Sequence, residues 1–566
     1  MTKKNSIIPI LTILIFWFIT SFYKISDRDL WSTGETREAE IAQEMIESND
    51  YLVPKFNKEF LPWKPPLFHW MECIASVFTK KQVDSFSSRL PSSLSFLIGA
   101  FIIFFILSGI TNINSRFFAA IIFLTANKSS WMSRVAQIDL MFSVLVGTAL
   151  LLFFRFYYFH QNLTEKQKKS YLLLFYTVSA LAVLAKGPAG IVLITGGIFL
   201  FLLFDRNLSF IPKCIDLWGL LIFVLISSSW YLTIIFIKGK EFAYEFFIVQ
   251  NINRFFNAFD HKHPFTYYIA KFIGGFMPWS FFFIAGCITT INRRIYEKKI
   301  MFFSFMCFSF IFLFFSFSGS KRGVYILPLY ISASILTGIY IAEFTDTSQK
   351  KVFPVLYKIS SFLNATFFII LASLFFVFQN NSLQSFVYNI SLPHLSEFDQ
   401  IMFEKIQPFI EKHSIAMLTT SFVIFFTGII IIVALYKKRY LLTFYITAFG
   451  ILFLNLFSVN MITPLLDSQR SLKPFTLKVD DELDKNDIVY SYGIGNEDLV
   501  YYSKRKVISC QNIEDIKAVI EKKPDLIYIF TDKKYLQQFN DLNIKHKILF
   551  DTGIQQLDGV LLRIDP

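Results

Sequence analysis

The sequence predicts a polytopic α-helical membrane protein with a small α/β domain at its carboxyl end. Apolar residues make up 54% of the 566 residues, and 71 residues are Phe. The mean hydropathy is +0.49, which is typical of membrane proteins rather than soluble ones. Apolar runs long enough to cross about 30 Å of hydrocarbon recur along the chain, and we expect roughly thirteen spans.

The expected spans can be placed in order. The first run, Ile7 to Tyr23, lacks a small-residue cleavage site and is predicted to be a retained anchor rather than a signal peptide. Leu67 to Phe78 has only about half the usual spanning length and is predicted to lie in the outer interface. The other spans centre near Phe101, Ile121, Val146, Ala180, Ile194, Leu225, Phe282, Phe310, Ser332, Phe368, Phe425 and Phe449.

Basic loop residues set the predicted orientation, because cytoplasmic loops carry an excess of Lys and Arg. With a cytoplasmic amino terminus, these loops contain Lys166/Lys168/Lys169, Arg293/Arg294/Lys298/Lys299, Lys350/Lys351/Lys358 and Lys437/Lys438/Arg439. Counting Leu67 to Phe78 as a span would move all of these clusters outside. The exterior therefore receives the loops 26–89, 238–271 and 380–413 and the tail after Val459.

The chain divides into a transmembrane domain over residues 1–465 and an extracytoplasmic α/β domain over residues 466–566. The second part alternates β-rich runs with amphipathic helical patterns. Its Gly493-Ile494-Gly495 lacks the third glycine of a dinucleotide fingerprint and is interpreted as a turn. The expected strands are 488–492, 499–502, 526–530, 548–550 and 560–564, and the expected helices are 513–521 and 533–539.

Composition also excludes some functions. The net charge is +13, but the basic residues are scattered through short loops, so nucleic acid is not an expected partner. The cysteines include no CxxC pair, and only Cys510 lies in the external tail. Neither a disulfide framework nor a thiolate metal site is indicated.

The first external loop is dense in charge. The residue pattern in its first part indicates a surface helix that runs to about Ile46. We expect Ser32 or Thr33 to cap this helix, with Glu35 completing a capping box. Several prolines then enforce extended or turning chain before the next apolar run.

This loop resembles that of the polyisoprenyl-phosphate-dependent glycosyltransferases of GT-C type. It reads LW-x-x-x-E-T-R-x-A-E-I-x-x-E-M, then D-Y-x-V-P, then K-P-P-L-x-x-W. The pattern is similar to that of the lipid A aminoarabinose transferases (ArnT) and, more distantly, of the dolichyl-phosphate-mannose-protein mannosyltransferases. About a dozen positions agree in order over roughly forty residues, which amphipathic patterning alone would rarely produce.

Further motifs extend the resemblance from about Leu30 to Tyr330. They are AQID at 136–139, AKGP at 185–188, NRF at 253–255, HxHPFxYY at 261–268 and SxSKRxxYxLP at 318–328. In the last hundred residues, SQRSLKP at 468–474 is the most family-like piece.

Basic residues on the outer side are informative, because the usual charge bias disfavours them there. A buried lipid phosphate would explain them, since cations neutralise it and the charge that develops as the sugar leaves. Structural alternatives are that Arg37 pairs on its own helix with Glu40 or Glu44, that Lys64 reaches to lipid head groups, and that Lys186 marks a span end. The candidate donor-phosphate ligands are Arg37, Lys64, Lys186, Arg254, Lys321, Arg322 and Tyr325.

The resemblance implies that Arg37, Lys64 and Tyr325 hold the donor phosphate. It also implies that Asp139 and an acidic residue of the first loop border the reacting centre. The family usually has Asp-Glu in that loop, but here Gly34 replaces the Asp, which leaves Glu35. Glu35 is therefore a catalytic candidate with Asp139, with three alternatives: a helix cap, an anionic acceptor that needs no strong base, or a weakened enzyme.

A metal pair implied by the family pattern is incomplete, because Trp63 stands where a Glu is expected. His261 and His263 are interpreted as interfacial hydrogen-bonding residues. We therefore predict neither a metal nor another cofactor.

The resulting hypothesis is an integral glycosyltransferase of the bacterial inner membrane. Its expected partners are a polyisoprenyl-phosphate-linked sugar, a lipid A-like or protein acceptor and the membrane lipids, and the resemblance implies displacement with inversion. The main alternative is a transporter or lipid flippase, although such proteins usually show paired inverted halves with broken spans. A third hypothesis is a membrane protein with a structural or sensory role.

Overall fold

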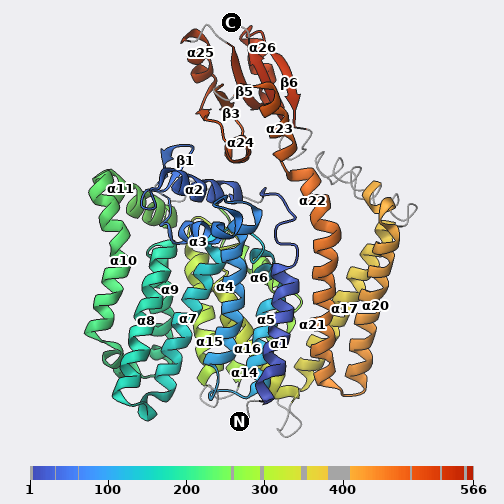
Figure 1. Cartoon of the computed structure of the whole chain (residues 1–566). Coiled ribbons are helices and arrows are strands. Elements are labelled where there is room, and N and C mark those ends of the chain that lie inside the picture. Colours follow the sequence, from blue (N-terminus) through green and yellow to red (C-terminus); the bar gives the residue numbers. More distant parts are fainter. Residues whose placement is uncertain are drawn as a thin grey trace.

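The computed structural model describes residues 4–31, 34–61, 63–256, 261–292, 299–345, 354–379, 408–484, 487–522, 526–552 and 558–564. It shows a bundle of long helices with a small α/β domain at one end (Figure 1). The first helix begins at the opposite end of the bundle.

Long apolar helices form most of the bundle. Among the described residues, eight helices are long and apolar enough to cross a membrane, or nine if the bent pair α13 (Tyr267–Phe276) and α14 (Ser280–Asn292) is one span. The eight are α4 (Ser85–Ile106), α7 (Ile138–Phe159), α8 (Glu165–Lys186), α10 (Leu217–Lys238), α15 (Lys299–Phe317), α17 (Pro354–Gln379), α20 (Ser414–Tyr436) and α21 (Tyr440–Phe457).

Four shorter apolar helices complete the set of predicted spans. They are α1 (Lys4–Trp17, continued by η1, Phe18–Phe22), α5 (Ile113–Thr125), α9 (Ala189–Phe204) and α16 (Leu329–Thr345). Every predicted run thus falls on a helix, and the polytopic helical fold is confirmed. The four differ from the prediction in length, and α5 and α16 are buried among other helices rather than exposed to lipid along their sides.

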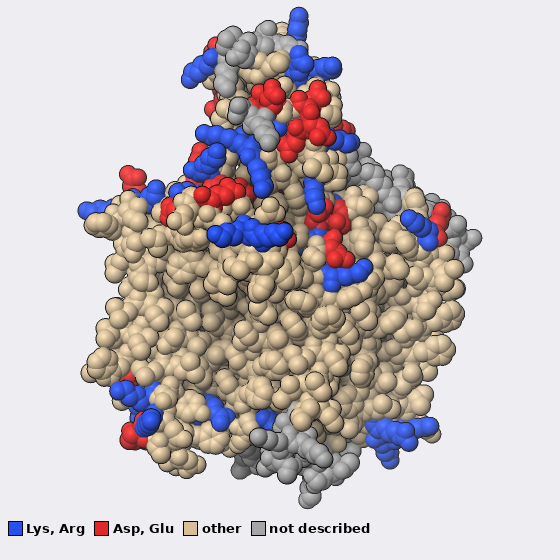
Figure 2. Space-filling view, in the orientation of Figure 1, with Lys and Arg blue, Asp and Glu red and all other residues tan. Residues whose placement is uncertain are grey.

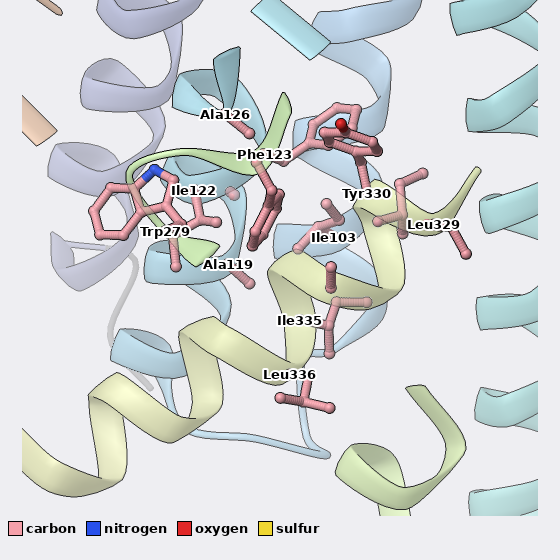
Figure 3. Packing of buried hydrophobic residues seen from close by; sticks show 14 of the residues in the cluster. Ile103, Ala119, Ile122, Phe123, Ala126, Trp279, Leu329, Tyr330, Ile335 and Leu336 are labelled. Atoms are coloured by element: carbon pink, nitrogen blue, oxygen red, sulfur yellow. The ribbon is translucent and has the colours of Figure 1, made fainter. Parts of the chain in front are cut away.

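The centre of the bundle is a large apolar core. Figure 3 shows Ile122 and Phe123 of α5 in one cluster with Ile103 of α4 and Ile335 of α16. A Cβ on Gly338 would lie only 2.4 Å from the Ala119 nitrogen, so the glycine allows α16 to pack closely on α5. This contact holds together helices that reach the site from different parts of the sequence.

The loop between η1 and α4, which was predicted to be external, forms a cover on the end of the bundle that carries the α/β domain (Figure 1). It contains helix α2 (Glu35–Ser48), the hairpin of β1 (Lys55–Phe56) and β2 (Glu59–Phe60), and helix α3 (Leu67–Ala75), followed by η2 (Ser76–Thr79). Helix α3 falls on the run that was predicted to be too short to span.

Helix α2 begins at Glu35, directly after Gly34. The cap residue is Gly34, which has a left-handed φ of 81° and supplies no side-chain bond. The carboxylate of Glu35 takes part in a buried ion cluster. Ser32 and Thr33 lie outside the described residues. The helix ends at Ser48 because Asn49 takes a left-handed φ of 53°.

Charged side chains gather at the two ends of the molecule, and the belt between them carries none on the face in view (Figure 2). The loops α7–α8 and α20–α21, with two of the predicted cytoplasmic clusters, lie at the end opposite to α2 and the α/β domain (Figure 1). Outside the described residues lie Arg293, Arg294, Lys298, Lys350, Lys351 and most of the expected loop 380–413.

The remaining elements of the bundle are short helical segments. They are α6 (Asn127–Met132), η3 (His160–Asn162), η4 (Leu208–Cys214), α11 (Lys240–Ala243), the π-helix η5 (Tyr244–Asn253) and α12 (Arg254–Phe256).

The carboxyl-terminal domain is built on a five-stranded sheet of order β4-β3-β5-β7-β6. Strands β3, β4 and β5 are parallel, and β7 runs antiparallel to β5 and β6. The strands are β3 (Val489–Tyr492), β4 (Val507–Cys510), β5 (Ile527–Asp532), β6 (Lys547–Asp551) and β7 (Gly559–Ile564). The predicted small α/β domain is therefore present.

Helices connect and cover this sheet. The predicted strand 499–502 is wrong, because this run forms α24, and the prediction missed β4. A short apolar run does not by itself distinguish a strand from a buried helix. After η7 (Ser458–Ile462), the helices are α22 (Thr463–Arg470), α23 (Lys473–Glu482), α24 (Glu497–Ser503), α25 (Ile513–Lys522), η8 (Lys533–Tyr535) and α26 (Leu536–Asp541).

Candidate active site

Glu35 lies at the centre of a buried ion cluster. Its carboxylate is 2.8 Å from Arg28 Nη2 and accepts bonds of 2.9 Å from Arg89 Nε and from the amide of Ala136. Burial alone would raise the pKa of Glu35, but Arg28 and Arg89 lower it to about 2. Glu35 therefore joins α2, α4 and the segment before α7, and its predicted catalytic role stays a prediction.

Asp139 and Lys186 form a second ion pair, at the ends of α7 and α8 that were predicted to be external. Asp139 is in the first turn of α7, is 7% exposed and pairs with Lys186, the last residue of α8. The Lys186 ammonium also lies 4.9 Å from the ring centroid of Tyr325. Three predicted site residues are thus brought together from distant parts of the chain.

More cations surround Asp139. Lys64 and Arg322 lie within electrostatic range of its carboxylate, and so does Lys128 of α6. Within the described part of the chain, the charged groups of Lys128 and Arg322 have neither a hydrogen bond nor an ion pair. We call Lys64, Lys128, Lys186 and Arg322 the basic cluster.

Lys128 is a member that sequence reasoning missed. Burial lowers its pKa, and Lys271 and Arg322 lower it further, while Asp139 acts in the opposite direction. The available signal was a lysine just after a predicted span on the outer side, the same signal that identified Lys186.

Glu38 was also missed. Its Oε1 accepts bonds from Lys64 Nζ at 2.8 Å and Arg37 Nη2 at 3.2 Å, and its Oε2 lies 3.0 Å from His69 Nε2. Burial works to raise the pKa of Glu38, but Lys64, His69 and Arg37 hold it well below its usual range. The signal in the sequence was that Glu38 lies about one helical turn beyond Gly34.

Arg37 connects the loop to the α/β domain. Its Nη1 donates a bond of 2.8 Å to Glu497 of α24, and its guanidinium lies 5.3 Å from the Trp63 ring centroid. The alternative pairing with Glu40 or Glu44 is not observed in the structure.

Lys321 and Arg254 lie in two segments of the chain that bond to each other. The Gly319 amide donates to the Phe255 carbonyl at 2.6 Å, and the Lys321 amide donates to the His261 carbonyl at 3.0 Å. The buried Lys321 ammonium donates to the Ser318 carbonyl, and Arg254 Nη1 donates to Gln250 Oε1 at 3.4 Å. Both ligand assignments stay predictions.

A cavity of about 310 Å³ lies beside the Glu35 cluster. Its charged end is lined by Lys24, Arg28, Arg89 and Arg134, and no carboxylate lines it within the described residues. Its apolar end is lined by residues of α17 and α21 that include Phe367, Leu371, Phe375 and Ile451.

The described residues contain no group of three or more His, Cys, Asp and Glu side chains that could hold a metal ion. His261 is exposed, and His263 is exposed and stacks on Tyr267 with centroids 4.2 Å apart. These histidines therefore lie at the surface of a loop that was predicted to be external.

Comparisons with known proteins agree with the order of the motifs. Residues 63–231 match the family model of dolichyl-phosphate-mannose-protein mannosyltransferase. An uncharacterized protein of Aquifex aeolicus is 29% identical over 348 residues, which covers 60% of this chain and 65% of that protein. The undecaprenyl phosphate-alpha-4-amino-4-deoxy-L-arabinose arabinosyl transferase of Shewanella sediminis is 27% identical over 367 residues, which covers 64% of each chain. The matches thus span less than two thirds of the relatives' length.

Solved structures show the same fold. ArnT from Cupriavidus metallidurans bound to undecaprenyl phosphate has a TM-score of 0.76 at 16% identity, over 100% of this chain and 98% of that chain. The archaeal oligosaccharyltransferase AglB from Archaeoglobus fulgidus has a TM-score of 0.50 at 10% identity, over 94% and 70%. The resemblance read from the sequence is therefore confirmed, and the apolar helices and these relatives indicate an integral inner-membrane protein.

Proposed function

We propose that this chain, which has the GT-C fold of ArnT, is an integral-membrane glycosyltransferase. It moves a sugar from a polyisoprenyl, undecaprenyl-type phosphate to a lipid A-like or protein acceptor outside the cytoplasm. The observation that carries the proposal is the basic cluster, which gathers around Asp139 at the outer end of the bundle.

A donor phosphate would supply the negative charge and the hydrogen-bond acceptors that this cluster lacks. Within the described residues, the charged groups of Lys128 and Arg322 form neither a hydrogen bond nor an ion pair. Lys64 pairs with Glu38, and Lys186 pairs with Asp139. Charge-assisted bonds to a phosphate are roughly twice as strong as neutral ones, and a poorly solvated site strengthens them further. Tyr325 adds a hydroxyl donor beside Lys186. Arg37, Arg254 and Lys321 belong to the same proposal as ligands that approach from the neighbouring loops.

The same cations assist departure of the sugar. The bond between the anomeric carbon and the phosphate oxygen breaks, its electron pair goes to the phosphate, and the cluster stabilises the resulting charge. Asp139 borders the reacting centre. Attack by the acceptor on the opposite face gives inversion.

The cavity beside the Glu35 cluster is our proposed entry for the acceptor. Its cationic end suits phosphate groups, and its apolar end suits acyl chains, so it fits an anionic lipid better than a peptide. The Ala136 amide bonds to Glu35, and Arg28 and Arg89 line the cavity, so the cavity adjoins the segment that carries Asp139.

The α/β domain is placed outside the cytoplasm in this proposal. It lies at the same end of the bundle as the basic cluster and opposite the basic loops α7–α8 and α20–α21, which the charge bias assigns to the cytoplasm.

The test starts with substrate identification. Mass spectrometry of a deletion strain should show accumulated undecaprenyl-phosphate sugar and a missing modification of lipid A or glycoprotein. Purified protein in nanodiscs, given that sugar donor and acceptor, should release undecaprenyl phosphate in step with acceptor labelling. Lys437→Ala, at the opposite end of the bundle, is the matched control. Movement of the donor across the bilayer without release would identify a flippase instead.

A further inference from the structure

Glu38 is the acidic residue of the first loop that contacts the candidate phosphate ligands directly. Its Oε1 is shared by Lys64 at 2.8 Å and Arg37 at 3.2 Å. Glu35 and Glu38 are both buried, but the described partners of Glu35 are Arg28, Arg89 and a backbone amide. Of these two glutamates, only Glu38 is in contact with the proposed donor-binding groups.

The position of Glu38 also relates it to Gly34. A Cβ on Gly34 would lie 2.7 Å from Arg37 Nη2, the nitrogen that donates to Glu38 Oε1. Position 34 and the Glu38 carboxylate therefore both adjoin this guanidinium nitrogen, which has to move aside when position 34 carries a side chain.

We propose that Glu38 is the carboxylate that removes the acceptor's proton, from the place that an aspartate at position 34 would occupy. This inference rests on the proposed function. Lys64 and Arg37 turn from Glu38 to the donor phosphate as it binds, and the released carboxylate regains its ability to accept a proton. Donor binding thus switches on the base.

The reaction balances with these groups. The acceptor oxygen forms a bond to the anomeric carbon as its hydrogen passes to Glu38, and the phosphate leaves with the electron pair of the broken bond. His69 remains bonded to Glu38 Oε2 and orients it. Glu72 of α3 adds no competing charge, because burial, and then the nearby Glu38, raises its pKa well above the usual range.

The test compares Glu38→Gln with Glu47→Gln, which changes an exposed glutamate on the same helix. Two quantities are measured on folded protein in nanodiscs: kcat with saturating sugar donor, and the Kd for undecaprenyl phosphate. For Glu38→Gln, kcat should fall about 10²- to 10⁴-fold, which is typical for loss of a general base. The Kd should decrease severalfold, because the amide no longer competes with the phosphate for Lys64 and Arg37.

This combination separates a base from a residue that only positions Lys64. A positioning role would weaken undecaprenyl phosphate binding, so a lower kcat with a higher Kd would overturn the inference, as would a kcat within threefold of the wild type. If the wild type itself transfers no sugar, the proposed function fails rather than this inference.

A second variant tests where the catalytic carboxylate lies. In Gly34→Asp/Glu38→Gln, the carboxylate is restored from position 34, and we expect kcat to recover at least tenfold over Glu38→Gln. Asp tolerates a left-handed backbone better than most residues, and the end of the Arg37 side chain has to shift to make room for it. A folded double variant that binds undecaprenyl phosphate but recovers no activity would contradict the shared location.

Discussion

Lys186, the last residue of α8, forms an ion pair with Asp139, in the first turn of α7. The two residues are far apart in the sequence, and their pairing sets the position of the proposed reacting centre. Lys186→Ala should destabilise the protein by about 3 kcal/mol, because removing one partner leaves the other charge buried and unpaired.

The double variant Lys186→Ala/Asp139→Asn should regain most of that stability and remain inactive. Thermal unfolding in detergent, read as a double-mutant cycle, measures the coupling. Transfer activity at the wild-type level in the stable double variant would remove both residues from the site.

Lys64→Ala should reduce kcat/KM for the donor about ten- to a hundredfold, since a lost charge-assisted bond costs about 1.5 to 3 kcal/mol. Glu38 keeps Arg37 and His69 as partners, so we expect a smaller effect on unfolding than for Lys186→Ala. Initial rates across donor concentrations provide the measurement, with Lys437→Ala as the control. Unchanged kcat/KM in folded Lys64→Ala protein would exclude Lys64 as a phosphate ligand.

The sequence predicts the spans and several site residues, but it does not predict which side chains pair with each other. The spans could be placed because hydropathy is averaged over many residues, so local errors cancel. Asp139, Lys186 and Tyr325 were predicted as site residues because each lies in a family-like motif at a span end. The partners of Glu35 and Glu38 could not be predicted, because a buried carboxylate selects partners by three-dimensional distance. In the α/β domain, residues 499–502 were wrongly assigned to a strand, because a short apolar run does not distinguish a strand from a helix. These residues form a helix because α24 packs on α2, and this contact could not be predicted from the sequence.

Glu35→Gln should be destabilising rather than specifically inactivating. Arg28 and Arg89 would lose the carboxylate that neutralises them in a buried site, and the amide can still accept only part of their bonds. We expect a lower Tm, with kcat per folded molecule falling less than tenfold. A normal Tm combined with abolished transfer would instead restore Glu35 as the catalytic carboxylate.

The same residue predicts a pH dependence. Because the folded-state pKa is about 2 and the ordinary value is 4.5, the stabilisation from Glu35 is present above pH 4.5 and is lost as the pH falls towards 2. The unfolding temperature of the wild type should therefore drop over this window more steeply than that of Glu35→Gln.

The orientation of the bundle is tested with single cysteines. In spheroplasts, an impermeant thiol reagent should label a cysteine introduced at Lys534 in the α/β domain and should not label one at Lys437. The expectation follows from the basic α20–α21 loop, which the charge bias places in the cytoplasm. Labelling only at position 437 would reverse the orientation and move the proposed site to the cytoplasmic side.

Docking of the α/β domain onto the first loop should depend on pH through Asp498. Thr36 donates a bond of 2.6 Å to this carboxylate, and Tyr501 and Tyr502 of the same helix bond to the Val83 and Leu30 carbonyls. Burial raises the pKa of Asp498 to about 6; the bond from Thr36 opposes this shift, and the charges of Glu497 and Glu35 add to it.

A folded pKa above the ordinary value of 3.8 means that the docked state favours the protonated acid. Docking should therefore be strongest below about pH 4 and weaken as the pH rises through 6. Asp498→Asn, which keeps the acceptor for Thr36 without the charge, should remove this dependence and dock at pH 8 at least as firmly as the wild type does at pH 5. Hydrogen exchange of the α24 amides across this range provides the measurement, with Asp541→Asn in α26 as a control away from the interface. Equal protection factors in the wild type at pH 5 and pH 8, after correction for the intrinsic pH dependence of amide exchange, would show that Asp498 does not regulate the contact.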